Sequence, residues 1–103
     1  MKKYILDFSN IQNYSDIHRV IKEALDFPDY YGCSLDAFWD CLTDMYGEKM
    51  QITVIGAEVI EKSFGADIPK KIIEVLKRFK YFSDSFEKDI EIKIVNKSDI
   101  FIL

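Results

Sequence analysis

Three short runs of β-branched and aromatic residues alternate with long stretches whose apolar residues recur at helical spacing. The runs occupy residues 4–8, 50–55 and 90–94. The third run alternates isoleucine with charged residues, which is typical of a strand with one buried face. Strands separated by helices pair in parallel through right-handed crossovers. The sequence therefore predicts an α/β fold with a small three-stranded parallel sheet packed with about four helices.

Four stretches have the apolar spacing and the terminal residues of helices. Ser or Asp at the start caps free backbone N–H groups of the first turn, while Gly and Pro end a helix. The predicted helices run from a cap at Ser15 to the stop at Pro28, from a cap at Ser34 to Gly47, over residues 57–64 up to Gly65, and from Asp67 through Phe79.

The chain fits one domain. Its 103 residues are 49% hydrophobic and 31% charged, which is typical of a globular protein. No stretch approaches the roughly 18 apolar residues of a membrane span, and the first residues lack the apolar run of a signal peptide. We expect a single domain over residues 1–103, with a C-terminal extension at residues 96–103, in the cytoplasm and without membrane contact.

This extension finishes with four consecutive apolar residues at positions 100–103. Left in water, such a segment promotes aggregation. We therefore expect it to pack on the domain, either by extending the sheet or by covering an exposed edge. A monomer is expected, and a dimer through this segment stays open as an alternative.

The predicted helix after Ser34 has two contrasting faces. Its apolar stripe, at the spacing of a buried face, contains Leu35, Phe38, Trp39 and Leu42. Asp36, Asp40 and Asp44 are four residues apart and therefore stack along a neighbouring face. Like charges at this spacing repel by roughly 0.2 to 0.5 kcal/mol per pair, and Asp is a poor residue inside a helix. Because the pattern costs stability, it indicates a functional surface.

Negative charge is concentrated around this helix. Residues 23–48 contain seven carboxylates and no Lys, Arg or His, in a chain of net charge −4. Such a field repels nucleic acid and attracts basic partners, whose association it accelerates. Tyr30 and Tyr31 precede the helix, and tyrosine gives contact area at a low entropy cost. We expect one of them to face a partner and the other to pack on the core.

Catalytic and metal-binding alternatives fit the sequence less well. The three aspartates and Glu48 are oxygen ligands of the kind that Mg²⁺ or Ca²⁺ binds, but side chains spread over about 12 Å of helix cannot all reach one ion. Cys33 and Cys41 are too far apart on a helix to form a disulfide easily, and His18, expected at the surface or half-buried, is the single histidine. We expect a non-enzymatic binding protein with no cofactor and no metal.

A specific motif spans the turn and the acidic helix. It consists of Tyr30-Tyr31-Gly32, followed by Leu35-Asp36-Ala37 and Trp39-Asp40-Cys41-Leu42-Thr43. This motif closely resembles the barstar family, which inhibits the secreted bacterial ribonuclease barnase. The resemblance implies an intracellular inhibitor whose acidic helix blocks the active site of a small basic ribonuclease by mimicking RNA phosphates.

The resemblance also implies roles for single residues. Asp40 would be the central phosphate mimic, bonded to arginines of the nuclease, and Asp36 a second acid at the same site. Tyr30 would pack against a catalytic histidine of the nuclease, and Trp39 would mostly hold the helix to the core. The predicted partner-binding residues are Tyr30, Tyr31, Gly32, Asp36, Trp39, Asp40 and Asp44.

Three positions depart from the family pattern. Asp44-Met45 stands where the family has Gly-Trp, and Arg78 stands at or near the position of a further inhibitory carboxylate. The expected partner is therefore a basic ribonuclease, either barnase-like or the nuclease domain of a toxin. The alternative function is an acidic immunity or interaction module for another basic toxin or nuclease.

Overall fold

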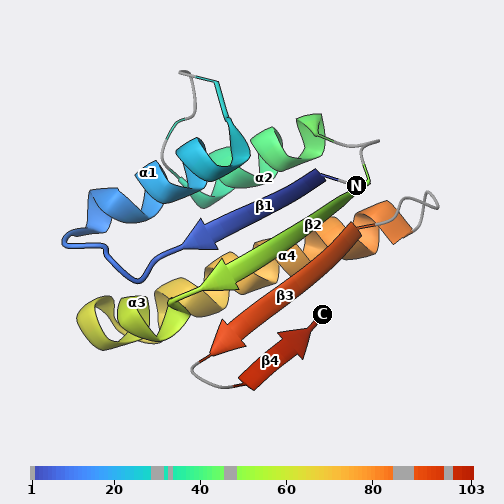
Figure 1. The fold of residues 1–103 in the computed structure, drawn as a ribbon. Helices are drawn as coiled ribbons and strands as arrows, with labels where there is room; N and C mark the ends of the chain where they lie inside the picture. The colour runs from blue at the N-terminus through green and yellow to red at the C-terminus, as the bar shows by residue number, and fades with distance from the viewer. Residues whose placement is uncertain (1, 29–31, 33, 46–48, 85–89, 97–98) are drawn as a thin grey trace.

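The computed structural model describes residues 2–28, 32, 34–45, 49–84, 90–96 and 99–103, which form one sheet and one layer of helices (Figure 1). In chain order the elements are β1 (Lys2–Asp7), α1 (Tyr14–Leu25), α2 (Leu35–Asp44), β2 (Met50–Ile55), α3 (Ala57–Phe64), α4 (Asp67–Asp84), β3 (Ile90–Asn96) and β4 (Asp99–Ile102). The predicted α/β alternation is confirmed. None of the helices in these ranges is both long and apolar enough to cross a membrane.

The sheet has the strand order β1-β2-β3-β4. Its first three strands are parallel, as predicted, with Leu6 opposite Val54 and Val54 opposite Ile94. β4 pairs antiparallel with β3, so the sheet has one strand more than the three predicted. An antiparallel strand can follow after two residues, whereas a parallel strand needs a long crossover. Of the two alternatives expected for the C-terminal segment, the structure has the extension of the sheet, but Ile100, Phe101 and Ile102 stay exposed.

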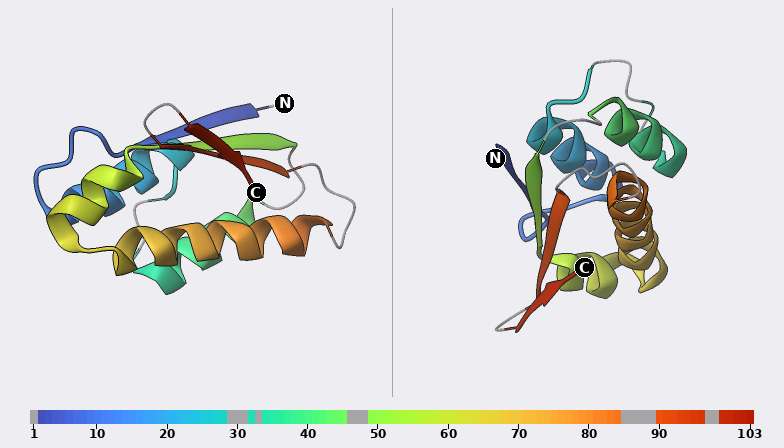
Figure 2. Two further views of the ribbon diagram at one scale, coloured as in Figure 1. Left: turned by 90° about the horizontal axis from the view of Figure 1, so that it is seen from below. Right: turned by 90° about the vertical axis from the view of Figure 1, so that its right-hand side faces the viewer.

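The four helices of the described chain lie on one side of the sheet, as the edge-on view in Figure 2 shows. Alternate side chains of β2 and β3 point to this side and are buried. They meet the apolar stripes of the helices in one core that includes Ile17, Ile21, Phe38, Leu42, Ile52, Ile72, Leu76, Phe79 and Ile92. Burying a side chain of this size stabilises a fold by about 1.5 to 3 kcal/mol. The core thus fixes which faces of the helices stay in water.

Helix α1 begins two residues earlier than predicted. Its N-cap is Asn13, not Ser15, because Asn13 Oδ1 accepts from the backbone N–H of Asp16 at 3.1 Å. Ser15 lies inside the helix and donates its hydroxyl to the same oxygen at 2.6 Å. The carboxylate of Asp16 accepts from the N–H of Gln12 at 2.8 Å and pairs with Arg19 at 2.9 Å. The start of α1 is therefore a small polar network around Asn13 and Asp16.

His18 on α1 is buried, with 5% of the residue exposed, and not at the surface or half-buried as expected. Its ring meets the ring of Tyr14 edge-on at 5.7 Å, and Tyr14 in turn meets Phe64 of α3 at 6.1 Å. Sequence spacing placed His18 near the helix start but did not show that α3 would close over this end of α1. Burial lowers the pKa of His18, since an imidazolium loses its hydration there.

Gly56 joins β2 to α3 where the backbone just after β1 passes close by. Its φ of 82° lies in the left-handed region. A Cβ at this position would lie 2.6 Å from the backbone nitrogen of Ser9 and 2.9 Å from the carbonyl carbon of Phe8. Both the conformation and the close approach therefore require glycine. Gly65 ends α3, as predicted.

Candidate functional site

Helix α2 carries most of the predicted site, and a side-chain cap fixes its start. Ser34 has an extended backbone (φ −133°, ψ 166°), and its Oγ accepts from the backbone N–H of Ala37 at 3.1 Å. The carbonyl of Ser34 accepts from the N–H of Phe38 at 2.9 Å, which closes the first helical turn. The predicted cap at Ser34 is confirmed. The predicted end at Gly47 lies outside the described residues, and the last helical residue is Asp44, with Met45 as the C-cap.

The predicted apolar stripe of α2 is buried in part. Phe38 and Leu42 are buried, Leu35 and Trp39 are half-buried, and Cys41, which the stripe did not include, is buried as well. The acidic row, our name for Asp36, Asp40 and Asp44, is exposed along about 12 Å of the helix, because each residue rises about 1.5 Å. Among the described residues, none of these carboxylates has a hydrogen-bond or ion-pair partner. Their charge is therefore available to a binding partner.

The helix dipole acts differently at the two ends of the acidic row. Asp36 lies in the first turn, where a negative charge is favourable. Asp44 lies at the negative C-terminal end, and the last turn contains no basic residue to offset it. Asp40 lies between two like charges, each four residues away. The row thus costs local stability at Asp40 and Asp44, which agrees with the prediction that stability did not select it.

Trp39 connects α2 to α4. Its half-buried indole meets the ring of Phe82 edge-on, with the ring centroids 6.0 Å apart. The guanidinium carbon of Arg78 lies 4.6 Å from the centroid of the Trp39 ring, within the range of a cation–π contact. Both contacts tie the helix that bears the acidic row to the longest helix of the fold.

A groove of about 260 Å³ runs along this contact between α2 and α4. Leu35, Asp36 and Trp39 line it from α2. Its other wall is the part of α4 that holds Lys71, Glu74, Val75 and Arg78. One border of the acidic row is therefore a strip of mixed charge. The sequence did not predict this border, because it depends on how two distant helices pack.

Comparison with known proteins agrees with this arrangement. The model of the family described as Barstar (barnase inhibitor) matches residues 1–95. The chain belongs to the barstar family. A curated relative from Bacillus subtilis (strain 168) is named "Putative ribonuclease inhibitor YrdF" and is 54% identical over 43 residues. The match covers 42% of this chain and 47% of that relative, so the chain spans about half the length of the relative.

The barstar-family motif before α2 is described only in part. Tyr30 and Tyr31 lie outside the described residues, and their predicted roles stay predictions. Gly32 is exposed, and a Cβ there would lie 3.6 Å from the Cβ of Ala37, an ordinary van der Waals distance. Space therefore does not require glycine at this position. The predicted place of Gly32 in the interface stays a prediction.

Cys41 is a cysteine on α2, next to Asp40 of the acidic row. It is buried, with 5% exposed. Burial, and then the nearby charges of Asp44 and Asp40, raise the pKa of its thiol above the usual value. A protonated, buried thiol is a poor nucleophile at neutral pH. Within the described ranges, no three His, Cys, Asp or Glu side chains come together as metal ligands. The arrangement is suited to binding through charge.

Proposed function

We propose that this protein inhibits a small basic ribonuclease by covering the nuclease active site with the acidic row of α2. The observation that carries the proposal is a row of three exposed carboxylates, without partners among the described residues, on one helix of a barstar-family chain. A nuclease active site binds RNA phosphates with Arg and Lys. Planar arginines pair with carboxylates through two parallel hydrogen bonds, so carboxylates can take the place of phosphates.

Each predicted residue has a distinct role in this proposal. Asp40, at the middle of the row, is the central phosphate mimic, and Asp36 reaches the same site from the first turn. Tyr30, Tyr31 and Gly32 extend the interface before the helix. Trp39 is a positioning residue, because its contacts with Phe82 and Arg78 hold α2 against α4. Asp44 lengthens the acidic surface beyond the family pattern.

The protein acts by stoichiometric binding in the cytoplasm of the cell that makes the nuclease. Its net charge of −4 and the seven carboxylates of residues 23–48 steer a basic partner toward α2. Rapid capture of this kind slows as salt is added, because the charges are screened over about 10 Å at 0.1 M ionic strength.

Titration of ribonuclease activity tests this function. Against a panel of guanyl-specific ribonucleases that includes barnase, the protein should abolish the activity of its target at about equal molar amounts. Asp40→Asn should weaken inhibition by at least about tenfold, since desolvated charge pairs are costly to break. Asp26→Asn is the matched control, because Asp26 is an exposed carboxylate at the end of α1 and Asn also tolerates its left-handed backbone (φ 53°).

Two results would contradict the proposal. One is the absence of inhibition of every ribonuclease in the panel at micromolar concentrations. The other is an equal loss of inhibition in the Asp26→Asn and Asp40→Asn variants, which would reflect net charge and not the acidic row. Folding of each variant is verified by urea unfolding.

Arg78 narrows the kind of nuclease that fits. The guanidinium of Arg78 lies over Trp39, and Lys71 shares the groove with Asp36, so cations border the acidic row. A uniformly basic nuclease surface is repelled at this border. We infer that the cognate nuclease carries an acidic residue opposite Arg78, which favours a partner other than barnase itself.

Association kinetics with barnase test this inference. Arg78→Glu should raise the association rate constant several-fold at low salt, because charges at the rim of an interface act chiefly on association. Lys62→Glu makes the same change of net charge on α3, away from α2 (Figure 1), and should have a smaller effect. An effect no larger than that of Lys62→Glu would place Arg78 outside the interface, and slower association would contradict the inference.

A further inference from the structure

The two edge strands of the sheet differ in the kinds of side chain that they expose to solvent. The exposed residues of β1 are Lys2, Lys3, Ile5 and Asp7, and charge on an edge strand discourages pairing with another chain. β4 instead exposes Ile100, Phe101 and Ile102, at 63%, 52% and 66% of their surface. A strand with apolar side chains on both faces is typical of a sheet interior. In the described chain, however, β4 lies at the edge.

The register shows which backbone groups of β4 face outward. Leu103 donates its N–H to the carbonyl of Ile92 at 3.0 Å, and Phe101 lies opposite Ile94. Hydrogen-bonding residues alternate along an antiparallel pair, so Phe101 and Leu103 face β3. The N–H and C=O groups of Ile100 and Ile102 therefore point to the open edge, where a further strand can bond to them.

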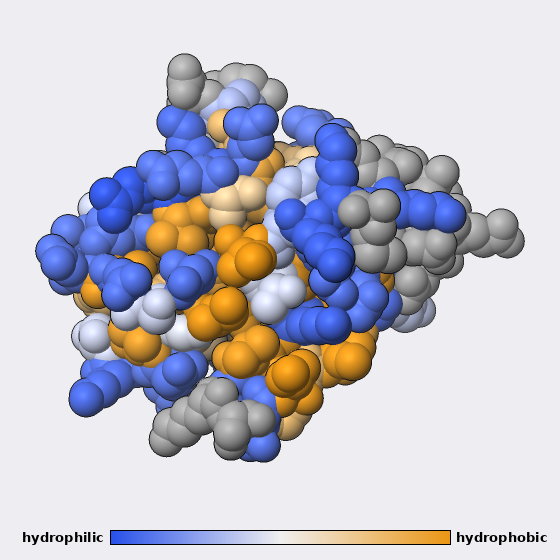
Figure 3. Space-filling view, viewed as in Figure 1, coloured by the Kyte–Doolittle hydropathy of each residue, from blue (hydrophilic) through white to orange (hydrophobic). Residues whose placement is uncertain are grey.

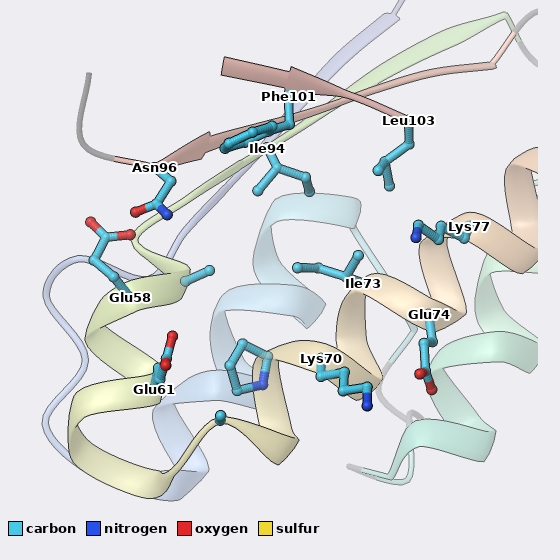
Figure 4. Close-up of a pocket in the computed structure, with 13 residues that line it drawn as sticks. Glu58, Glu61, Lys70, Ile73, Glu74, Lys77, Ile94, Asn96, Phe101 and Leu103 are labelled. Atoms are coloured by element: carbon cyan, nitrogen blue, oxygen red, sulfur yellow. The ribbon is translucent and has the colours of Figure 1, made fainter. Parts of the chain in front are cut away.

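Both surfaces next to this edge include apolar side chains among charged ones. On the helix side, Phe101 and Leu103 lie over a cavity of about 520 Å³ together with Ile73 and Ile94 (Figure 4). On the opposite side no described helix covers the sheet, and Figure 3 shows an apolar band across it. Ile100 and Ile102 belong to this side, since they pair with Val95 and Lys93. A strand added to β4 would cover apolar surface on both sides at once.

We propose that β4 pairs with β4 of a second copy of this chain, antiparallel and about a twofold axis at Phe101. In this register Ile100 lies opposite Ile102 of the second copy, and the same pair recurs on the other side of the axis. Each of these pairs exchanges two backbone hydrogen bonds, so four form in total. The two Phe101 side chains meet as a closely spaced pair on the helix side.

Charge complementarity supports a second copy in this register. Asp99 lies on the helix side of β4, as Phe101 and Leu103 do, because alternate residues share a face. Pairing about Phe101 brings Asp99 of one copy opposite Leu103 of the other. Lys77 lines the cavity beside Leu103 (Figure 4). Among the described residues, neither Asp99 nor Lys77 has an ion-pair partner. The twofold axis therefore creates an Asp99–Lys77 pair twice.

The dimer leaves the proposed inhibitory surface free. α2 packs near the β1 side of the molecule and β4 forms the opposite edge, as Figures 1 and 2 show. Two copies joined at β4 form a continuous sheet and carry their acidic rows at the two far ends. If the proposed function holds, each copy in the dimer can bind one nuclease, so the dimer can bind two nuclease molecules at once.

Sedimentation velocity over a concentration series tests the dimer. We expect a reversible monomer–dimer equilibrium in the micromolar range, because an interface of a few residues per copy is small. Ile102→Lys should shift this equilibrium to monomer by at least about tenfold in the dissociation constant. Ile5→Lys is the matched control. Ile5 is 56% exposed on the same open face, in the row that runs through Thr53 and Lys93 to Ile102, and should leave the dimer unchanged.

Two further variants test the register. Ile100→Pro removes an N–H that faces the open edge, so it should abolish the dimer while the folded monomer keeps its stability. Asp99→Lys should weaken the dimer, and Asp99→Lys combined with Lys77→Glu should restore it. A monomer throughout the micromolar range would overturn the proposal. So would open-ended growth beyond dimer, equal loss of dimer with Ile5→Lys, or no rescue by the charge exchange.

Discussion

Burial gives His18 a pH-dependent effect on stability. The folded state favours the neutral imidazole, because burial lowers the pKa of His18, whereas the unfolded chain takes up a proton near pH 6.5. Below that pH the unfolded state binds more protons than the folded state, so the free energy of unfolding decreases as the pH is lowered. The contribution is fully present above about pH 6.5 and is lost as the pH falls toward the lower folded-state pKa.

Urea unfolding of the native chain and of the His18→Gln variant, at about pH 7.5 and about pH 5.5, measures this effect. The wild-type protein should lose more stability between the two values than the variant, which has no imidazole to protonate. Asp7 does not interfere, because hydrogen bonds from Ser9 lower the pKa of its carboxyl from 3.8, below this window. Equal losses in the two proteins would show that His18 does not titrate as the structure indicates.

At the scale of single elements, the start of α1 makes a testable distinction between two polar residues. Asn13 caps the helix, while the hydroxyl of Ser15 donates a hydrogen bond to Asn13 Oδ1 and caps no backbone N–H. Asn13→Ala should therefore lower the free energy of unfolding by about 1 kcal/mol, and Ser15→Ala should change it by less than about 0.5 kcal/mol. Urea unfolding compares the two variants, with Asn13→Ser as a control that keeps a capping oxygen. A larger effect at Ser15 would contradict the cap.

Helix boundaries were predictable where one signal stood alone. Ser34 is the one capping residue at the start of α2, and the structure places the cap there. Before α1, Asn13 and Ser15 compete, and the sequence does not show which oxygen reaches a free N–H. The exposure of the acidic row followed from its four-residue spacing. The groove that contains Lys71 and Arg78 was not predictable from the sequence, because it depends on the packing of α2 against α4.

At the scale of the whole molecule, the parallel sheet was predictable because each strand is separated from the next by helices. The sequence did not decide whether residues 100–103 extend the sheet or cover an edge, since four consecutive apolar residues do not show a period of two. Its position also explains why Ile100 and Ile102 remain exposed: β4 extends the sheet without a helix above it. Pairing of edges between two copies would give these residues the surroundings that their composition indicates.

In the proposed function, the acidic row of α2 binds a nuclease and lowers the stability of the free protein. Asp40 has a like charge on either side and no partner among the described residues. Asp40→Ala removes two repulsive pairs and improves helix propensity, so the free protein should become more stable by about 0.5 to 1 kcal/mol. Binding should weaken by about 2 to 5 kcal/mol, because the arginines of the nuclease lose their carboxylate.

Urea unfolding and nuclease inhibition of Asp40→Ala, measured side by side with the unaltered chain, test the role of Asp40. We expect a more stable protein that inhibits poorly. A less stable protein with intact inhibition would show that Asp40 serves the fold and that the acidic row is not the inhibitory surface.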